Sequence, residues 1–476
     1  MTTSARTIHS WLDDFFAAYY RHRPVNATFI GDHRYDHLLP DLSENGAGDC
    51  LADMARLLEQ LDALPEASLS SSEAIDRKLA AGFLRIQQWE FASTHFHRGN
   101  PSYYTGEAIF GIIGLFLTDY APVMERIAAA TERMARIPAF LARAQQTVRQ
   151  APAAWTERAL RECDGAQALF GSGIDLLLAQ EDIENAQLRK VADDARAAFA
   201  RFADYLRSDL LARPNDNYAC GAEAFDLMMR EGHFLDVSVA DLVAQAEDAL
   251  AEADAHLVRH AADFDAATPD AALAQLAELH PSPDEYYGRY GTLWRDCRAT
   301  ALEHGFLTWP DFPIEYVPRP LWVREAAPYL YFLFYRSPAA FNRPPIHQYL
   351  VAPLDPNLST REQEAFLRSN NDSVIKLNHI VHHGAIGHHV QNWHAFRAPS
   401  RIGRIAAVDC ASRIAMFCGG TMAEGWACYA TDLMGEAGFL TPLERYAEAQ
   451  SRRRMAARAI VDVKLHCGEF SLDEAT

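Results

Sequence analysis

Six of the nineteen histidines in this chain lie within sixteen residues: His379, His382, His383, His388, His389 and His394. Imidazole is the commonest protein metal ligand and also carries protons near neutral pH. Glu424 follows later, an isolated carboxylate in the helix-like segment 423–429. Paired histidines on one helix and a glutamate from a later helix form the ligand set of many zinc enzymes. The pattern predicts a metal site for Zn²⁺, with Fe²⁺ or another divalent transition metal as the alternative.

Which histidine of the second doublet joins His382 depends on the path of the helix. On a straight helix, positions seven apart differ by about 20°, so His382 and His389 share a face. His382 and His388 differ by about 120° and need a local bend. Gly384 and Gly387 lie between the doublets and weaken a helix there. Both alternatives therefore stay open.

A second group lies near the C-terminus, where Arg454, Arg458, Asp462 and His466 follow one another at intervals of four residues. This spacing places all four side chains along one stripe of a helix. Asp462 could orient His466 through a ring N–H beside a metal or catalytic site. A surface ladder of ion pairs is the alternative. Cys428, four residues after Glu424, is expected to be a small core residue.

The elements that must position these residues are mostly helices. Apolar residues recur with helical spacing over 7–21, 73–94, 154–178, 184–211, 237–263 and 286–304. Residues 305–357 hold ten prolines and many aromatic residues, and runs such as 314–317 and 329–335 indicate strands or extended loops. Helix resumes at Ser359. We therefore divide one continuous unit into a helical region 1–304, a Pro/aromatic strand-and-loop patch 305–357, and a helical metal-site region 358–476. The predicted fold is mainly α, with a small β-sheet flanking a central cleft.

The charge, cysteine spacing and apolar content of the chain argue against several classes of protein. The net charge of −20 disfavours a nucleic-acid partner, because an acidic surface repels phosphates. None of the eight cysteines forms a CxxC pair, so reduced thiols are expected. The N-terminus lacks the apolar run of a signal peptide, and no window reaches the ~20 apolar residues of a membrane span. We expect a cytoplasmic protein with no membrane partner.

Several motifs together resemble the bacterial DUF885 family, a zincin-like group placed with the metallopeptidases. The family pattern H-E-x-x-P-G-H-H-x-Q is matched at 382–391, its E-G-W-x-x-Y helix at 424–429, and its R-x3-D-x3-H at 458–466. Landmarks at 24–31, 41–43, 74–76 and 133–141 extend the likeness to the N-terminal part. The resemblance implies a helical zincin-type fold. It also implies that His382, Glu424 and one of His388 or His389 bind metal, and that His466 contacts substrate or stabilises an oxyanion.

Two departures from the family pattern affect the expected reaction. The glutamate expected to act as general base is His383 here, and the proline is Ile386. His383 could serve as base, as a further ligand or as an inactivating replacement. Family members also usually continue about a hundred residues further. That part of the site is therefore lost, supplied by a partner polypeptide, or cut away from this chain. We predict a metal-dependent hydrolase acting on a peptide or amide bond. A non-hydrolytic metalloenzyme for a small molecule, with two histidines and a carboxylate on iron, and a silent paralogue that binds a partner are the alternatives.

Overall fold

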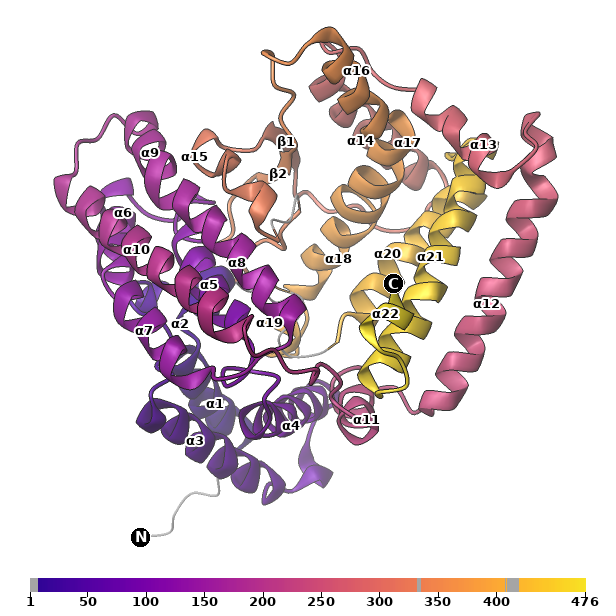
Figure 1. Ribbon diagram of the computed structural model, residues 1–476. Coiled ribbons are helices and arrows are strands. Elements are labelled where there is room, and N and C mark those ends of the chain that lie inside the picture. The colour runs from indigo at the N-terminus through magenta and orange to yellow at the C-terminus, as the bar shows by residue number, and fades with distance from the viewer. Residues whose placement is uncertain (1–6, 332–334, 407, 409–418) are drawn as a thin grey trace.

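The structure is a computed structural model that describes residues 7–331, 335–406, 408 and 419–476. It is mainly α-helical, as predicted. Most helices of its N-terminal half form one side of the molecule, while the last of them, α11 (Ala222–Glu231), lies beside the lower end of α12 (Val239–His260) (Figure 1). These elements are α1 (Ile8–His22), α2 (Pro24–Ile30), η1 (His33–Tyr35), α3 (Glu44–Asp62), η2 (Glu66–Ser68), α4 (Ser71–Ala92), α5 (Pro101–Ile113), α6 (Val123–Met134), α7 (Ile137–Thr147), α8 (Ala153–Ala168), η3 (Leu169–Gly173), α9 (Ile174–Gln180), α10 (Ala186–Tyr205), η4 (Leu206–Leu210) and α11 (Ala222–Glu231).

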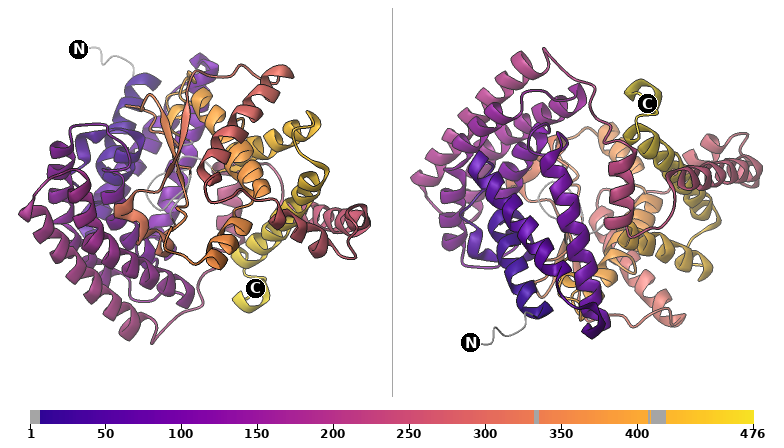
Figure 2. Two further views of the ribbon diagram at one scale, coloured as in Figure 1. Left: turned by 90° about the horizontal axis from the view of Figure 1, so that it is seen from above. Right: turned by 90° about the horizontal axis from the view of Figure 1, so that it is seen from below.

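The rest of the chain forms the other side of the molecule and the segment between the two sides, which Figure 2 shows from above and below. Its elements are α12 (Val239–His260), η5 (Ala261–Phe264), α13 (Pro269–Ala274), η6 (Gln275–Glu278), α14 (Tyr286–Glu303), β1 (Ile314–Pro318), α15 (Leu321–Arg324), η7 (Ala327–Tyr329), β2 (His347–Val351), α16 (Thr360–Ser369), α17 (Asp372–Val374), η8 (Ile375–Gly384), α18 (His388–Ala395), α19 (Gly403–Ala406), α20 (Thr421–Glu436), α21 (Pro442–His466) and α22 (Leu472–Ala475).

Helical periodicity identified α1, α4, α10, α12 and α14, because their apolar stripes face a core, whereas α3 and α5 were not predicted. In α1, Trp11, Leu12 and Phe15 are almost fully buried, and a capping box at Thr7 satisfies the first backbone N–H groups. The predicted capping box at Ser359 is also present and starts α16. The strand predicted over 314–317 is confirmed as β1. Of the run 329–335, Tyr329 ends the short helix η7, while residues 332–334 lie outside the described part of the chain.

The small sheet consists of two parallel strands, β1 and β2, with Ile314 opposite His347 and Pro318 opposite Val351. Parallel strands need a long connection, and here residues 319–346 supply it. On one side, the sheet packs into a second hydrophobic core that also contains α14, η8 and α20. The first core holds α1–α10 together with parts of residues 322–330 and 396–408. The helix α14 therefore shares a core with the histidine segment rather than with the N-terminal helices.

The histidine segment is tied to the C-terminal helices by a buried ion pair. Lys376 of η8 donates to Glu444 of α21 over 2.8 Å, and the two side chains are only 10% and 8% exposed. Glu444 also closes the capping box of α21. Removing one partner would leave a buried charge unpaired, which is strongly destabilising. Among the described helices, none combines the length and the apolar character that a bilayer crossing demands.

Candidate metal centre

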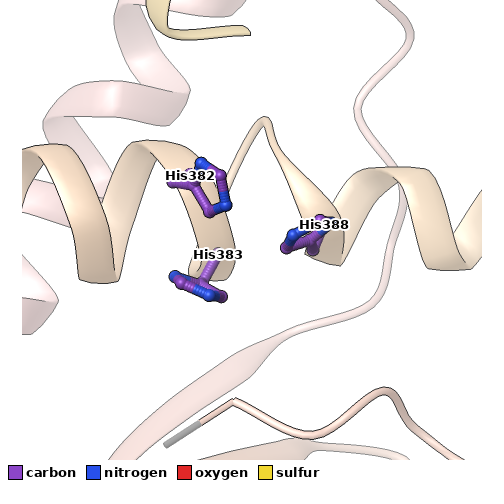
Figure 3. A group of neighbouring side chains, drawn as sticks. All are labelled: His382, His383 and His388. Atoms are coloured by element: carbon purple, nitrogen blue, oxygen red, sulfur yellow. The ribbon is translucent and has the colours of Figure 1, made fainter. Parts of the chain in front are cut away.

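The histidine cluster lies at a break between two helices. The element η8 is a wide π-helix that ends at Gly384, and α18 begins at His388. Between them, the ψ angles of Ala385 and Gly387 are −115° and −121°, far from helical values. The break swings the second histidine doublet relative to the first, as Figure 3 shows for His382, His383 and His388.

Close backbone approach requires both glycines at this break. A Cβ on Gly384 would lie 2.0 Å from the Tyr316 hydroxyl oxygen, and one on Gly387 would lie 1.9 Å from the carbonyl oxygen of His382. The Cβ on Gly384 would also lie 2.7 Å from the carbonyl oxygen of His379, so at both positions a side chain requires a shift of the backbone. The two glycines, recognised in the sequence as helix breakers, are therefore packing requirements of the folded site.

Two tryptophans donate hydrogen bonds to backbone carbonyl groups at the break. The Trp294 indole donates to the carbonyl oxygen of Gly384 over 2.9 Å. The Trp426 indole donates to the carbonyl oxygens of Ile386 and Gly387 over 3.0 and 3.2 Å. Trp426 lies on α20, two residues after Glu424, so the same helix fixes the break and supplies the carboxylate.

Replacing Gly387 by alanine is expected to lower the free energy of unfolding by at least about 2 kcal/mol, because the new methyl group collides with backbone. Gly425→Ala is the matched control. A Cβ at Gly425 meets no atom within 4 Å, so this change in α20 is expected to be neutral or to stabilise by up to about 1 kcal/mol. Denaturant unfolding of both variants tests this, and equal stabilities would contradict the packing role of Gly387.

The break brings three histidines together. His382, His383 and His388 each offer a ring nitrogen, and these nitrogens lie within 4.8 Å of one another. Glu424, in the first turn of α20, joins them. Its Oε2 is 3.2 Å from His382 Nε2, and its Oε1 is 3.6 Å from His388 Nε2. Two ligands of a tetrahedral ion, each at about 2.1 Å, are about 3.4 Å apart. The Nε2 atoms of His382 and His388 therefore each lie at about this distance from an oxygen of the Glu424 carboxylate.

Hydrogen bonds orient two of the rings. His388 Nδ1 lies 3.0 Å from the Gln391 side-chain oxygen, and His383 Nδ1 lies 2.7 Å from the carbonyl oxygen of Asn378. Since both partners are acceptors, each Nδ1 carries the proton and each Nε2 keeps its lone pair. This is the tautomer that a metal-binding imidazole needs, fixed by the kind of outer contact that metal sites use.

The electrostatics of the cluster suit a cation. Burial, with His382 and His388 nearby, lowers the pKa of His383 to about 3, so this ring is neutral at physiological pH. The neighbouring imidazoles of His382 and His388 hold the pKa of Glu424 well below its usual range, which keeps the carboxylate charged. The side chains of His382 and His388 are 18% and 11% exposed, whereas Glu424 is 51% exposed. The cluster is therefore open to solvent on the side of the carboxylate.

The alternative ligand, His389, points elsewhere. Its Nε2 donates to the carbonyl oxygen of Phe312 over 2.8 Å, and its ring stacks on the Phe312 ring. It is completely buried. Burial lowers its pKa to about 4, so it is a neutral core residue. The structure brings His388, not His389, to Glu424. His379 is likewise internal, with Nδ1 2.6 Å from the Tyr349 hydroxyl, and His394 lies on the exposed side of α18.

The second predicted group forms one stripe of α21. Asp462 and His466 lie at the end of α21, where Asp462 Oδ1 is 3.6 Å from His466 Nε2, an ion-pair separation longer than a hydrogen bond. Within the described residues, the group of converging ligand atoms holds His382, His383 and His388, without Asp462 or His466. Cys428 is exposed, so its expectation as a core residue is wrong. The side chain of Glu424, on the same helix, is also half exposed.

Sequence reasoning assigned no role to Gln391, Trp294 or Trp426. Gln391 and Trp426 stand inside the quoted motifs, and Gln391 follows His388 by three residues, the spacing that brings side chains together on a helix. Trp294 comes from α14, about ninety residues earlier, and no local pattern links it to the break.

Gln391→Leu is expected to weaken metal affinity by about 10- to 100-fold, because His388 loses the acceptor that fixes its ring. His394→Gln, a change on the exposed side of the same helix, is the control and is expected to keep the parental affinity. Competition with a coloured chelator measures both. An unchanged affinity in Gln391→Leu would show that this contact does not orient a ligand.

A separate cavity of about 620 Å³ lies where β2 faces the N-terminal helices. Its walls include His347 and Gln348 of β2, Phe116 after α5, and Leu177 of α9. His382, His383 and His388 are not among its lining residues. The small sheet thus borders a hollow that is distinct from the histidine cluster.

Comparisons with known proteins give a family and a fold. A family model described as "Bacterial protein of unknown function (DUF885)" matches residues 24–476. No curated protein matches the chain. A solved structure described as a "putative lipoprotein of unknown function" from Shewanella oneidensis has a TM-score of 0.74 at 20% identity, over 99% of this chain and 85% of that one. A "putative lipoprotein" from Colwellia psychrerythraea has a TM-score of 0.73 at 14% identity, over 98% and 85%.

Proposed function

Since this chain belongs to the DUF885 family of bacterial proteins, whose function is unknown, we propose that it is a metal-dependent hydrolase of a peptide or amide bond. His382, His388 and Glu424 would hold the ion, which we expect to be Zn²⁺. The observation that carries this proposal is the spacing of 3.2 and 3.6 Å between the Glu424 oxygens and the two Nε2 atoms. Three protein ligands leave one position of a tetrahedral ion for water or substrate, as in catalytic zinc sites.

A bound divalent ion supplies Lewis acidity and makes a water molecule acidic enough to lose a proton near neutral pH. The residues of this chain would bind the ion and keep its ligands in the correct orientation. Gln391 keeps His388 in the tautomer that presents Nε2. Glu424 brings negative charge and lies at the solvent-exposed edge, where a substrate can approach.

His383 would take the place of the general base. Its Nδ1 proton is engaged by the carbonyl oxygen of Asn378, so its Nε2 is the atom that can accept a proton. With a pKa lowered to about 3, this ring holds a proton weakly. Efficient general bases have a pKa near the operating pH. We therefore propose a hydrolase that is slower than a homologue with a carboxylate at this position.

The closeness of His383 to His382 and His388 favours a second candidate, a non-hydrolytic metalloenzyme in which His383 is a fourth ligand. Its ring nitrogen lies within 4.8 Å of those of His382 and His388, and a neutral imidazole is a good ligand for zinc, iron, copper and nickel. Three histidines and one carboxylate would then surround the ion. Such a site would leave no base for hydrolysis.

Substrate and place in the cell follow as further parts of the proposal. The net charge of −20 favours neutral or cationic substrates over nucleic acids. We keep the cytoplasm as the proposed location, although the two neighbours named above are described as putative lipoproteins. Fractionation of cells that express the gene from its own start would distinguish the two locations.

The proposal is tested with protein purified without a histidine tag, stripped by a chelator and reloaded with Zn²⁺, Mn²⁺ or Fe²⁺. A panel of fluorogenic peptides and aminoacyl amides is the substrate set. Cleavage that requires Zn²⁺ and vanishes with chelator is expected. Oxygen consumption by the Fe²⁺ form without cleavage would support the second candidate, and failure to bind any of the three ions would contradict both.

A further inference from the structure

Two cysteines from distant parts of the sequence meet at the end of α21. Cys220 lies in the loop before α11, and Cys467 caps α21, about 250 residues later. The N–H of Gly221 donates to the carbonyl oxygen of His466 over 2.9 Å. The thiol of Cys220 also approaches that carbonyl oxygen, with Sγ at 3.7 Å. The two chain segments are therefore in direct backbone contact, one residue away from each cysteine.

These contacts limit the distance between the cysteines. Across the hydrogen bond of 2.9 Å, standard backbone dimensions place the two Cα atoms at most about 8 Å apart. Disulfides join Cα atoms that are about 4.4 to 6.8 Å apart. Both side chains also pack against one apolar cluster, formed by Phe225, Met229 and Val463. The upper bound lies close to the disulfide range, and the shared apolar cluster places both cysteines at the same junction.

We propose that Cys220 and Cys467 form a disulfide under oxidation, which fastens the end of α21 to the start of α11. With oxidised glutathione as the oxidant, one thiolate attacks the glutathione disulfide and releases one molecule of glutathione. The second thiolate attacks the resulting mixed disulfide and releases another. Two electrons and two protons thus pass from the protein to the oxidant, and one S–S bond forms within the chain.

The disulfide would restrain α11, which also contacts the start of α20, the helix that carries Glu424. The other end of α11 meets the start of α20, where Gly419 N–H donates to the carbonyl oxygen of Gly232 over 2.6 Å. His233 Nδ1 also lies 2.6 Å from the Thr421 hydroxyl. The disulfide would therefore clamp α11 between α21 and the helix that carries Glu424. It would also close a loop of about 250 residues, which constrains the unfolded chain.

The test is peptide mapping of the full chain after incubation with excess oxidised glutathione in mildly alkaline buffer, because burial raises the pKa of both thiols. The Cys220 peptide is expected to be joined to the Cys467 peptide. The oxidised protein should melt about 2 to 6 °C above the reduced protein. Cys428→Ser, at an exposed cysteine, is the control and should keep the link and the shift. In Cys220→Ser both should be lost.

Mapping of the parental chain decides the matter even if a serine variant folds poorly. Free thiols at both positions, or glutathione adducts at Cys220 and Cys467 without a link, would overturn the proposal. A link between Cys428 residues of two chains would also overturn it if Cys220 and Cys467 stay unlinked. This experiment does not depend on the metal site, so its outcome is separate from that of the proposed hydrolase.

Discussion

His388→Gln protein is expected to lose its metal ion, with an affinity more than about 100-fold below that of the parental chain. His388 Nε2 and Glu424 Oε1 are 3.6 Å apart, as two ligands of one ion would be. Glutamine offers no imidazole nitrogen at that place, and a pair made of His382 and Glu424 holds a divalent ion poorly. Elemental analysis by mass spectrometry and chelator competition give the occupancy and the affinity.

Two control variants show whether the loss of metal is specific to His388. His389→Gln changes the neighbouring histidine, which faces Phe312, so it is expected to cost stability rather than metal affinity. His394→Gln changes an exposed residue and should alter neither. If His389→Gln loses the ion and His388→Gln keeps it, the assignment of the ligand is reversed. Far-ultraviolet circular dichroism of each variant separates loss of metal from loss of fold.

His383→Glu is expected to raise the rate of peptide or amide hydrolysis by about 10²- to 10⁴-fold, which is the rate enhancement that a well-placed general base usually provides. The parental imidazole holds a proton weakly, since burial and the neighbouring histidines lower its pKa to about 3. A carboxylate at this position would restore the residue that the family pattern places there. Steady-state cleavage of the best substrate of the zinc form measures the gain.

His383→Gln is the matched control, because it has a similar size to glutamate without the charge. It should show no gain and should keep the metal if His383 is not a ligand. Loss of the ion in His383→Gln would instead identify His383 as a fourth ligand and favour the non-hydrolytic candidate. An unchanged rate in a His383→Glu protein that still binds zinc would contradict the hydrolase proposal.

Several of the helices and part of the site could be predicted from the sequence, whereas α3 and the fully buried α5 could not. Amphipathic spacing reports which side of a helix meets a core, so α1, α12 and α14 could be found without any tertiary information. The two histidine doublets and Glu424 could also be recognised, because a cluster of ligand types is visible in the order of residues.

The choice between His388 and His389 could not be made in the same way. It depends on the backbone angles at Ala385 and Gly387, which Trp294 and Trp426 hold in place from distant helices. On a straight helix His389 would be the ligand, and the break rotates it into the core instead. The position of Asp462 and His466 likewise depends on how α21 packs, and helical spacing alone does not show what lies opposite its end.

The central claim is that His382, His388 and Glu424 bind one ion, and anomalous X-ray diffraction tests it most directly. Crystals of the untagged protein loaded with one equivalent of Zn²⁺ would be measured on both sides of the zinc absorption edge. The account predicts one strong peak at about 2.0–2.2 Å from His382 Nε2, His388 Nε2 and a Glu424 oxygen. A fully loaded protein whose peak lies elsewhere, with these three side chains hydrogen-bonded only to one another, would contradict it.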